Sequence, residues 1–385
     1  MLSSLSLRSC VVALLGLASF LQVPAYAEHV HHLYYNNIQW QDEDLTALTG
    51  GAIAGPSTAI SAIYTIPNDQ LHVYYVDDVV NHVHQLYFNG TNWSDTDLTS
   101  WTGAPNANPY GISAFAIKNL QFVFYVGWDS HVHELNYNNS TWVDSDITAI
   151  VGGNLATPAN IVAFPTKPNN QFHVYYQDAS NSNEYQLFFN GTSWTYQNLT
   201  SIAGAYCYTD WTTGIATQNL QHIICPGYGS QNSLDLHHIW YNNSTWVDED
   251  ISSKVHGAPL ELGSGVGIFQ VPTKAQGEVY AFTQDAHIHQ YTYKKSWSDV
   301  DLTATIGAPA NPYFGGMVAF ATTPNNQFHV YYQPGSEIYQ LFYNGSSWGV
   351  QDLTGGHGQA SYFSGGMSGF AIGNYQHVFY LSTGN

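Results

Sequence analysis

The fold is decided by His131-Val-His-Glu-Leu-Asn-Tyr-Asn-Asn-Ser-Thr-Trp142-Val-Asp-Ser-Asp-Ile-Thr148, because the chain repeats this stretch at nearly constant intervals. An earlier copy reads His82-Val-His-Gln-Leu-Tyr-Phe-Asn-Gly-Thr-Asn-Trp93-Ser-Asp-Thr-Asp-Leu-Thr99. The tryptophans of consecutive copies are 53, 49, 52, 52, 51 and 51 residues apart. A fixed period of about fifty residues indicates one supersecondary unit used many times. The tryptophans that mark the copies are Trp40, Trp93, Trp142, Trp194, Trp246, Trp297 and Trp348.

Each repeat contains four short segments with the composition of β-strands. The first is rich in small residues, as in Gly111–Ile117, and the second is aromatic and β-branched, as in Phe172–Tyr176. The third is the alternating His-x-His-x-Leu-x-Tyr run, and the fourth runs from the tryptophan to Asp-Leu-Thr. Asn-Gly or Asn-Asn joins the third segment to the fourth, which predicts a tight hairpin. Four antiparallel strands repeated radially form the blades of a β-propeller, with the small-residue strand innermost and the tryptophan strand outermost.

The order of segments at the two chain ends predicts how the ring closes. Residues 29–46 supply only a third and a fourth segment, six complete sets follow, and residues 365–381 supply only a first and a second segment. We therefore expect an all-β, seven-bladed propeller over residues 28–385, in which N-terminal strands three and four pair with C-terminal strands one and two. Shared closure joins the two half-blades by hydrogen bonds instead of leaving two open sheet edges. An open solenoid is the alternative, but split end repeats would serve no purpose in it.

Residues 1–27 have the pattern of a secretory signal peptide. Arg8 gives a positive start, Val11–Val23 is a short apolar run, and Ala25-Tyr-Ala27 is a small-x-small cleavage site. The apolar run is too short to cross a bilayer, which argues against a membrane anchor. We expect a secreted protein, extracellular or periplasmic, after cleavage near Ala27. In this oxidising setting we expect Cys207 and Cys225 to form a disulfide, with two buried free thiols as the alternative.

The charge of the chain excludes two classes of partner. Six lysines stand against 27 acidic residues once the expected signal peptide, with the only arginine, is removed. Nucleic-acid affinity depends on Lys and Arg displacing counterions, and anionic lipid repels an acidic surface. We therefore expect neither nucleic-acid binding nor membrane insertion.

Repetition of the polar residues also argues against an enzyme, and we expect no cofactor. A catalytic centre needs unlike residues gathered at one place, whereas these are copied around the ring, and no His-Glu-x-x-His motif is present. An axial active site would require an unrepeated polar cluster. The least regular repeat, with Cys207, Trp211 and Cys225, is the first place to look for one.

Two repeated polar patterns have both a metal-binding and a structural interpretation. The Asp pair of the fourth segment, such as Asp95 and Asp97 or Asp248 and Asp250, fits calcium, but charge that protects an outer edge strand explains it better. His-x-His pairs suit zinc or copper, but imidazoles that pack and hydrogen-bond between blades are the preferred interpretation, so no metal is assigned. These pairs are His29 and His31, His82 and His84, His131 and His133, and His287 and His289.

A second set of histidines lies on the second strand, and a polar residue follows it on the third. In two copies we place Val123 and Val279 at the histidine position. If these imidazoles contact a ligand, its affinity should change through pH 6–7. The second-strand residues are His72, His173, His222, His329 and His377. The third-strand residues are Gln85, Glu134, Gln186, His238, Gln290, Gln340 and, across the ring closure, His32.

Phe-His-Val-Tyr-Tyr-Gln, then Tyr-Gln-Leu-Phe-Phe-Asn-Gly, then Trp, resembles the blade of the fungal fucose-specific lectins of the Aleuria aurantia type. It is also similar to the repeat of seven-bladed bacterial fucose-binding propellers. The resemblance implies a sugar held by a second-strand Arg and a third-strand Glu, with aromatic residues of the next blade stacking on it. The twelve positions just named would take those roles. No copy has the Arg, and only Glu134, which we pair with Val123, keeps the Glu.

We therefore expect a secreted, multivalent, lectin-like protein with sugar sites between adjacent blades, for fucose or related sugars on glycans or glycoproteins. Shallow sites gain avidity by roughly 10²–10⁴ when several act together, so repetition suits this function. The alternative is a propeller scaffold that binds another protein without binding sugar. The sequence leaves the oligomeric state open.

Overall fold

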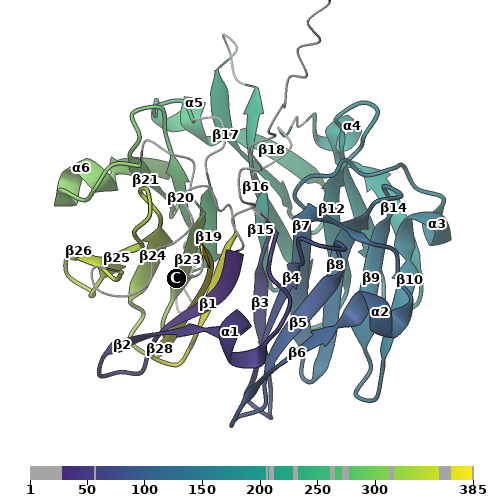
Figure 1. Ribbon diagram of the computed structural model, residues 1–385. Coiled ribbons are helices and arrows are strands. Elements are labelled where there is room, and N and C mark those ends of the chain that lie inside the picture. Colours follow the sequence, from purple (N-terminus) through teal and green to yellow (C-terminus); the bar gives the residue numbers. More distant parts are fainter. Residues whose placement is uncertain are drawn as a thin grey trace, which may run out of the picture.

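The computed structural model describes residues 28–55, 58–204, 207, 212–228, 233–260, 265–270, 277–311, 316–354 and 366–383. These residues form seven four-stranded antiparallel sheets arranged as blades around a central axis (Figure 1). The expected signal peptide, residues 1–27, and Trp211 lie outside the described residues. Among the helices of this described part, none combines the length and the apolar character needed to cross a bilayer.

Each blade uses its strands in the predicted order, from the axis outward. We number the blades 1–7 by their first strands. These are β3 (Ser61–Thr65), β7 (Ala107–Ile117), β11 (Val162–Pro165), β15 (Thr213–Thr217), β19 (Val266–Gln270), β23 (Met317–Ala321) and β27 (Met367–Ile372). The second strands are β4 (Gln70–Val76), β8 (Leu120–Gly127), β12 (Phe172–Gln177), β16 (Leu220–Tyr228), β20 (Gly277–Phe282), β24 (Phe328–Tyr332) and β28 (Tyr375–Thr383). The third strands are β5 (Val83–Phe88), β9 (Val132–Tyr137), β13 (Glu184–Phe189), β17 (Leu234–Tyr241), β21 (Ile288–Tyr293), β25 (Tyr339–Tyr343) and β1 (Glu28–Tyr35). The fourth strands are β6 (Trp93–Asp97), β10 (Trp142–Asp146), β14 (Trp194–Asn198), β18 (Trp246–Asp250), β22 (Trp297–Asp301), β26 (Trp348–Asp352) and β2 (Trp40–Asp44).

Blade 7 closes the ring as predicted. Its strand order is β2-β1-β28-β27, so it is built from both ends of the chain. β1 pairs with β28 along eight residues, from Glu28 opposite Thr383 to Tyr35 opposite Gln376. The seven-bladed propeller and its mode of closure are thus confirmed.

The repeated tryptophan joins each blade to the one before it. It begins the fourth strand, and in six blades its ring lies edge-on, about 6 Å from an aromatic ring on the second strand of the preceding blade. Edge-to-face pairs of this kind add to the free energy of simple burial. In blade 5 the second-strand position of the preceding blade is Ile224, and Trp297 lies against His238 instead, at 5.6 Å.

Short helices follow the outer strands, and the sequence interpretation missed them. In five of them the second Asp of the Asp-x-Asp pair is the N-cap, as where Asp97 accepts from the Ser100 amide, and a left-handed Gly or His ends the turn. This observation corrects the interpretation that the second Asp only protects the edge strand, because its carboxylate caps a helix. The helices are α1 (Leu45–Thr49), α2 (Leu98–Thr102), α3 (Ile147–Val151), α4 (Leu199–Ala203), α5 (Ile251–Val255) and α6 (Leu302–Ile306).

Small residues of the first strands surround the axis, where blades converge. A Cβ on Gly214 would lie 2.8 Å from the Phe164 ring, so only glycine fits there. The strands enclose an axial cavity of about 760 Å³. Among the described residues that line it, none is acidic, basic or a cysteine. The predicted Cys207–Cys225 disulfide is present, with 5.5 Å between the Cα atoms.

Candidate functional site: the grooves between blades

The second-strand histidines and their third-strand partners contact each other directly. His72 lies opposite Tyr87 and Gln85 opposite Tyr74, so the two polar side chains are diagonal neighbours on one face of blade 1. Gln85 Nε2 donates to His72 Nδ1 at 2.9 Å, and the imidazole contacts Thr65 on its other nitrogen. The other four pairs are His173–Gln186 at 3.0 Å, His329–Gln340 at 2.9 Å, His222–His238 at 2.9 Å and His32–His377 at 3.0 Å.

Three of these pairs lie in closed networks that a glutamine of the next blade completes. Gln85 Nε2 also donates to Gln121 Oε1 at 2.8 Å, and Tyr74 donates to the same oxygen. Gln221 and Gln376 do the same for the pairs of blades 3 and 6. The His72, Gln85 and Gln121 side chains are buried, so their polar groups are satisfied by one another.

Strand register corrects two of the sequence assignments. Glu134 lies opposite Phe124, and Gln290 lies opposite Tyr280. The histidine position of these blades is therefore Phe122 and Glu278, one residue before Val123 and Val279, because adjacent residues face opposite sides of a sheet. Phe172 of blade 3 packs on Phe122 at 4.5 Å, and burial raises the pKa of Glu134 to about 7. Gln290 donates to Glu278 at 2.9 Å, and Phe328 of blade 6 packs nearby on Phe269.

Two grooves share a different set of polar and aromatic side chains. They are groove 4/5, between blades 4 and 5, and groove 7/1, between blades 7 and 1. Groove 4/5 holds His222, His238 and Glu249, with Trp297 from the next blade. Groove 7/1 holds the corresponding residues His377, His32, Glu43 and Trp93. In both, the third-strand imidazole lies near the fourth-strand carboxylate, at 3.7 Å and 3.9 Å.

Groove 4/5 contains a cavity with a volume of about 210 Å³. His222, His238, Trp240, Glu249 and Trp297 are among the residues that line it. The next blade contributes Gly277 at the position that Gln121 and Phe172 fill elsewhere, and a Cβ on Gly277 would meet no atom of the described residues within 4 Å. The missing side chain therefore leaves the constellation accessible. In groove 7/1 the same position is Leu71, which is buried.

Neighbouring donor groups keep the cavity carboxylate ionised. The His238 imidazole, 3.7 Å away, has the largest effect, followed by Trp297 and Lys254, and together they lower the pKa of Glu249 to about 2 although burial opposes them. Trp297 Nε1 donates to one carboxylate oxygen at 3.0 Å, and Lys254 Nζ lies 3.0 Å from the other. Burial, with a smaller effect of His238, lowers the pKa of His222 to about 4. Near neutral pH the cavity thus presents a carboxylate, neutral His222 and two indole rings.

The second-strand histidines do not titrate in the expected window. Burial lowers the pKa of His72, His173 and His377 to about 3 and that of His329 to about 4. Any effect of these imidazoles on ligand affinity therefore belongs at a more acidic pH than the expected pH 6–7.

The His-x-His pairs bond within their own blade, which corrects the expected bonding between blades. In blade 1, His82 contacts Asp97 at 2.8 Å and His84 contacts Asp95 at 3.0 Å. Both acids lie on the neighbouring fourth strand, which the antiparallel register brings alongside. The pattern recurs in blades 2, 5 and 7. The first Asp of each Asp-x-Asp pair is thus a histidine partner and not an edge charge alone.

Sequence interpretation missed Glu249, Trp240, Trp297 and Gly277 as site residues. The sequence does carry a signal for Glu249. Blades 1 and 2 have Thr96 and Ser145 at the same register position, so the fold does not require a carboxylate there. Gly277 gives only a weak signal, because a glycine beside a loop is ordinarily explained by the conformation of a turn. The second- and third-strand pairs were found because they repeat, whereas Gly277 was missed because it departs from the repeat.

Solved lectins have a similar fold, whereas no family model and no curated protein sequence matches the chain. The BP39L lectin from Burkholderia pseudomallei has a TM-score of 0.64 at 17% identity, over 86% of this chain and 97% of that one. The fungal lectin from Aleuria aurantia, described with a "novel fucose recognition mode", has a TM-score of 0.52 at 14% identity, over 80% and 96%. SapL1 lectin, solved with alpha methyl fucoside, has a TM-score of 0.50 at 19% identity, over 78% and 97%. At these identities the similarity establishes the propeller fold.

Proposed function

We propose that this protein is a secreted, non-enzymatic carbohydrate-binding propeller and that groove 4/5 is its principal sugar site. The observation that carries the proposal is the coincidence of an open cavity, two indole rings and an ionised carboxylate between two blades. Solved propellers of the same fold include lectins in complex with fucosides, which supports the class of ligand. The predicted signal peptide and the disulfide support export.

The chemistry of the cavity suits a pyranose ring. An indole face packs against the apolar C–H face of a sugar, and the ionised Glu249 carboxylate can accept hydrogen bonds from hydroxyl groups, whereas both ring nitrogens of His222 already contact Thr217 and His238. The volume of about 210 Å³ is smaller than the roughly 300–1,000 Å³ of pockets for drug-sized ligands, so one sugar ring fits better than an oligosaccharide. Three or four hydrogen bonds of about 1 kcal/mol each give a roughly millimolar Kd for a monosaccharide.

The remaining predicted pairs stay predictions as sugar sites. Those of blades 1, 3 and 6 would have to break a buried network before a sugar could use their His and Gln groups. Occupation of several grooves, as first expected, would therefore require side-chain rearrangement, whereas in groove 4/5 the Glu249 carboxylate and two indole rings already line an open cavity. For this reason the proposal concentrates on groove 4/5.

A glycan array followed by calorimetric titration with free monosaccharides, L-fucose included, tests the proposal. We expect binding to glycans with one accessible terminal sugar, competition by that monosaccharide, and a change in tryptophan fluorescence because Trp240 and Trp297 line the cavity. If the protein binds no glycan on the array and no sugar raises its Tm, the proposal is overturned. Capture of a protein that monosaccharides do not displace would favour the scaffold alternative.

A further inference from the structure

A second chemical constellation lies at the end of blades 2 and 5 where the third strand begins. In both blades an aspartate stands two residues before the His-x-His pair: Asp129-Ser-His131-Val-His133 and Asp285-Ala-His287-Ile-His289. In blade 2, ligand atoms of Asp129, His131, His133 and Asp146 all lie within 4.8 Å of one another. In blade 5 the same holds for Asp285, His287 and Asp301.

The added aspartate has the same local geometry in the two blades. In blade 2 the His131 amide donates to Asp129 Oδ1 at 3.0 Å, and Asp129 Oδ2 lies 3.3 Å from His133 Nε2. In blade 5 the His287 amide donates to Asp285 Oδ1 at 3.1 Å, which leaves Oδ2 near the inner histidine. One carboxylate oxygen is thus fixed by the backbone, and the other faces an imidazole.

An unpartnered buried nitrogen points to a missing ligand in blade 5. His289 is 6% exposed, its Nδ1 contacts Asp299, and its Nε2 has no hydrogen-bond partner within the described structure. That Nε2 faces Asp285 Oδ2 across 3.5 Å, beyond normal N–H···O length. A buried polar atom without a partner loses roughly 1–3 kcal/mol, so a cation between the two groups would relieve it.

We propose that blades 2 and 5 each bind one Zn²⁺ ion through these residues. Imidazole nitrogen and carboxylate oxygen are ordinary zinc ligands, whereas Ca²⁺ needs six to eight oxygens. Ligand atoms around tetrahedral zinc are about 3.3 Å apart, so the 4.8 Å limit requires closure by at most about 1.5 Å among the four residues of blade 2 and among Asp285, His287 and Asp301 of blade 5. His289 lies outside that blade 5 group and would join it through its Nε2, which is 3.5 Å from Asp285. The Asp129 side chain is 40% exposed and His131 and Asp146 are half-buried, so small rotations suffice.

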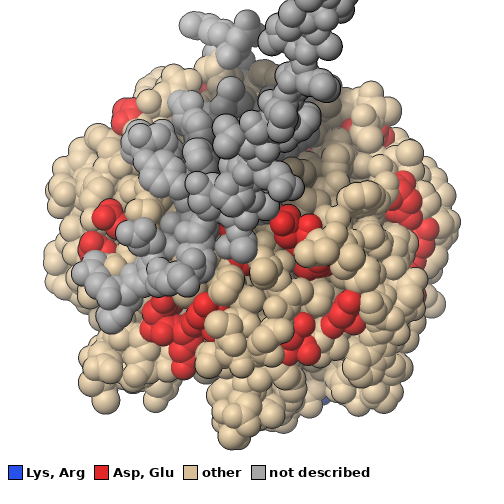
Figure 2. Space-filling view, viewed as in Figure 1, with Lys and Arg blue, Asp and Glu red and all other residues tan. Residues whose placement is uncertain are grey.

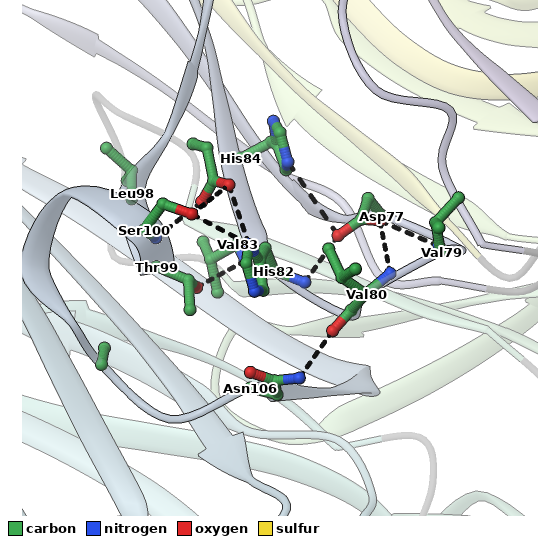
Figure 3. Close-up of polar contacts among 12 residues, drawn as sticks. Asp77, Val79, Val80, His82, Val83, His84, Leu98, Thr99, Ser100 and Asn106 are labelled. Carbon is green, nitrogen blue, oxygen red and sulfur yellow. Dashed lines mark hydrogen bonds and ion pairs between the residues drawn. The ribbon is translucent and has the colours of Figure 1, made fainter.

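Blade 1 offers a matched control, because it has the same histidine pair without the added aspartate. Val80 stands two residues before His82 (Figure 3). The nearby Asp77 is 2% exposed, and its two oxygens already accept from the Val79, Val80 and His82 amides at 2.8, 2.9 and 2.6 Å. Its carboxylate is saturated, so blade 1 should not bind zinc.

Equilibrium dialysis of the untagged, chelator-treated protein against Zn²⁺ tests the proposal without any sugar. We expect two zinc ions per chain, one after Asp129→Asn with His131→Asn, one after Asp285→Asn with His287→Asn, and two for the control His82→Asn. Co²⁺ should give the intense visible absorption of a tetrahedral site, diminished in each double variant. Fewer than two ions in the unaltered protein, binding that survives the double variants, or equal loss in the control would overturn it. A folded circular dichroism spectrum excludes unfolding as the cause.

Discussion

Groove 4/5 and groove 7/1 carry the same reactive groups, yet only one is left accessible by the next blade. Their histidine pairs are hydrogen-bonded at 2.9 and 3.0 Å, and each has a glutamate on the fourth strand and a tryptophan from the neighbouring blade. They differ on the next second strand, at Gly277 against Leu71, and also at Trp240 against Tyr34 and Ile224 against Phe379. Access to the polar groups of a groove therefore depends on the residues that fill it as well as on the polar pair.

In the other five grooves, too, a side chain of the next blade fills the space beside the polar pair. The filling position is Gln121, Gln221 or Gln376 in three of them, and each glutamine completes a buried network. It is Phe172 or Phe328 in two more, and each phenylalanine packs among aromatic rings. Acidic side chains recur over the face seen in Figure 2 without gathering in one patch, so surface charge does not single out a groove.

The largest expected effect comes from filling groove 4/5 with Gly277→Leu. The backbone at Gly277 is not in the left-handed region, and its Cβ would meet no atom of the described residues within 4 Å, so the side chain should fit without strain. It would occupy the space proposed for the sugar, and we expect sugar binding in that groove to fall at least 100-fold with Tm nearly unchanged. Titration calorimetry and a thermal melt measure the two. Retained affinity would place the sugar elsewhere.

The reverse exchange, Leu71→Gly, should open groove 7/1. Truncation of a buried leucine costs about 2–5 kcal/mol, and glycine within a strand adds about 0.5–1 kcal/mol, so the free energy of unfolding should fall by about 2.5–6 kcal/mol. The stoichiometry of sugar binding should rise by one, because the His377, His32 and Glu43 groups become accessible. Urea unfolding and calorimetry test both effects. An unchanged stoichiometry in a folded variant would show that the filling residue is not the deciding difference.

A smaller effect is expected from removing the charge at Glu249. Glu249→Gln keeps the shape of the side chain, but hydrogen bonds to a charged group contribute about 1.5–3 kcal/mol against about 1 kcal/mol for neutral ones. We expect sugar affinity to weaken about 3- to 30-fold, measured by calorimetry. The matched variant Glu43→Gln in groove 7/1 should leave affinity unchanged. Equal weakening by both would mean that the two grooves bind alike.

Most of the fold was predictable because repetition averages out local ambiguity. The tryptophan period and the split end repeats predicted both blade number and closure, and the Cys207–Cys225 pair followed from compartment and count. The helices were missed although Asp-Leu-Thr followed by glycine carries both cap signals. A one-residue error put Val123 in place of Phe122, because neighbouring residues in a strand look equally apolar.

The candidate site was predicted less well than the fold, for a physical reason. His222 and His238 were found because every blade has a counterpart. Accessibility depends on a contact between blades about fifty residues apart, and the absence of a side chain at Gly277 leaves no chemical signature in the sequence. Repeats therefore predict where sites can exist, and three-dimensional packing decides which of them is open.

Acidification should test a feature that the two grooves share, which is a buried second-strand histidine. The folded-state pKa values of His222 and His377, about 4 and about 3, lie below the 6.5 of an unfolded histidine. The unfolded chain therefore binds the extra proton first, and stability present above pH 6.5 is lost as the pH falls toward 4. Each histidine should contribute about 1.4 kcal/mol per pH unit, or about 2 kcal/mol between pH 6.5 and 5. Urea unfolding across this range should show a shallower pH dependence in His222→Asn and in His377→Asn than in the unaltered protein. A flattening confined to His377→Asn would mean that water admitted beside Gly277 already solvates His222, so that the two grooves differ in hydration as well as in access.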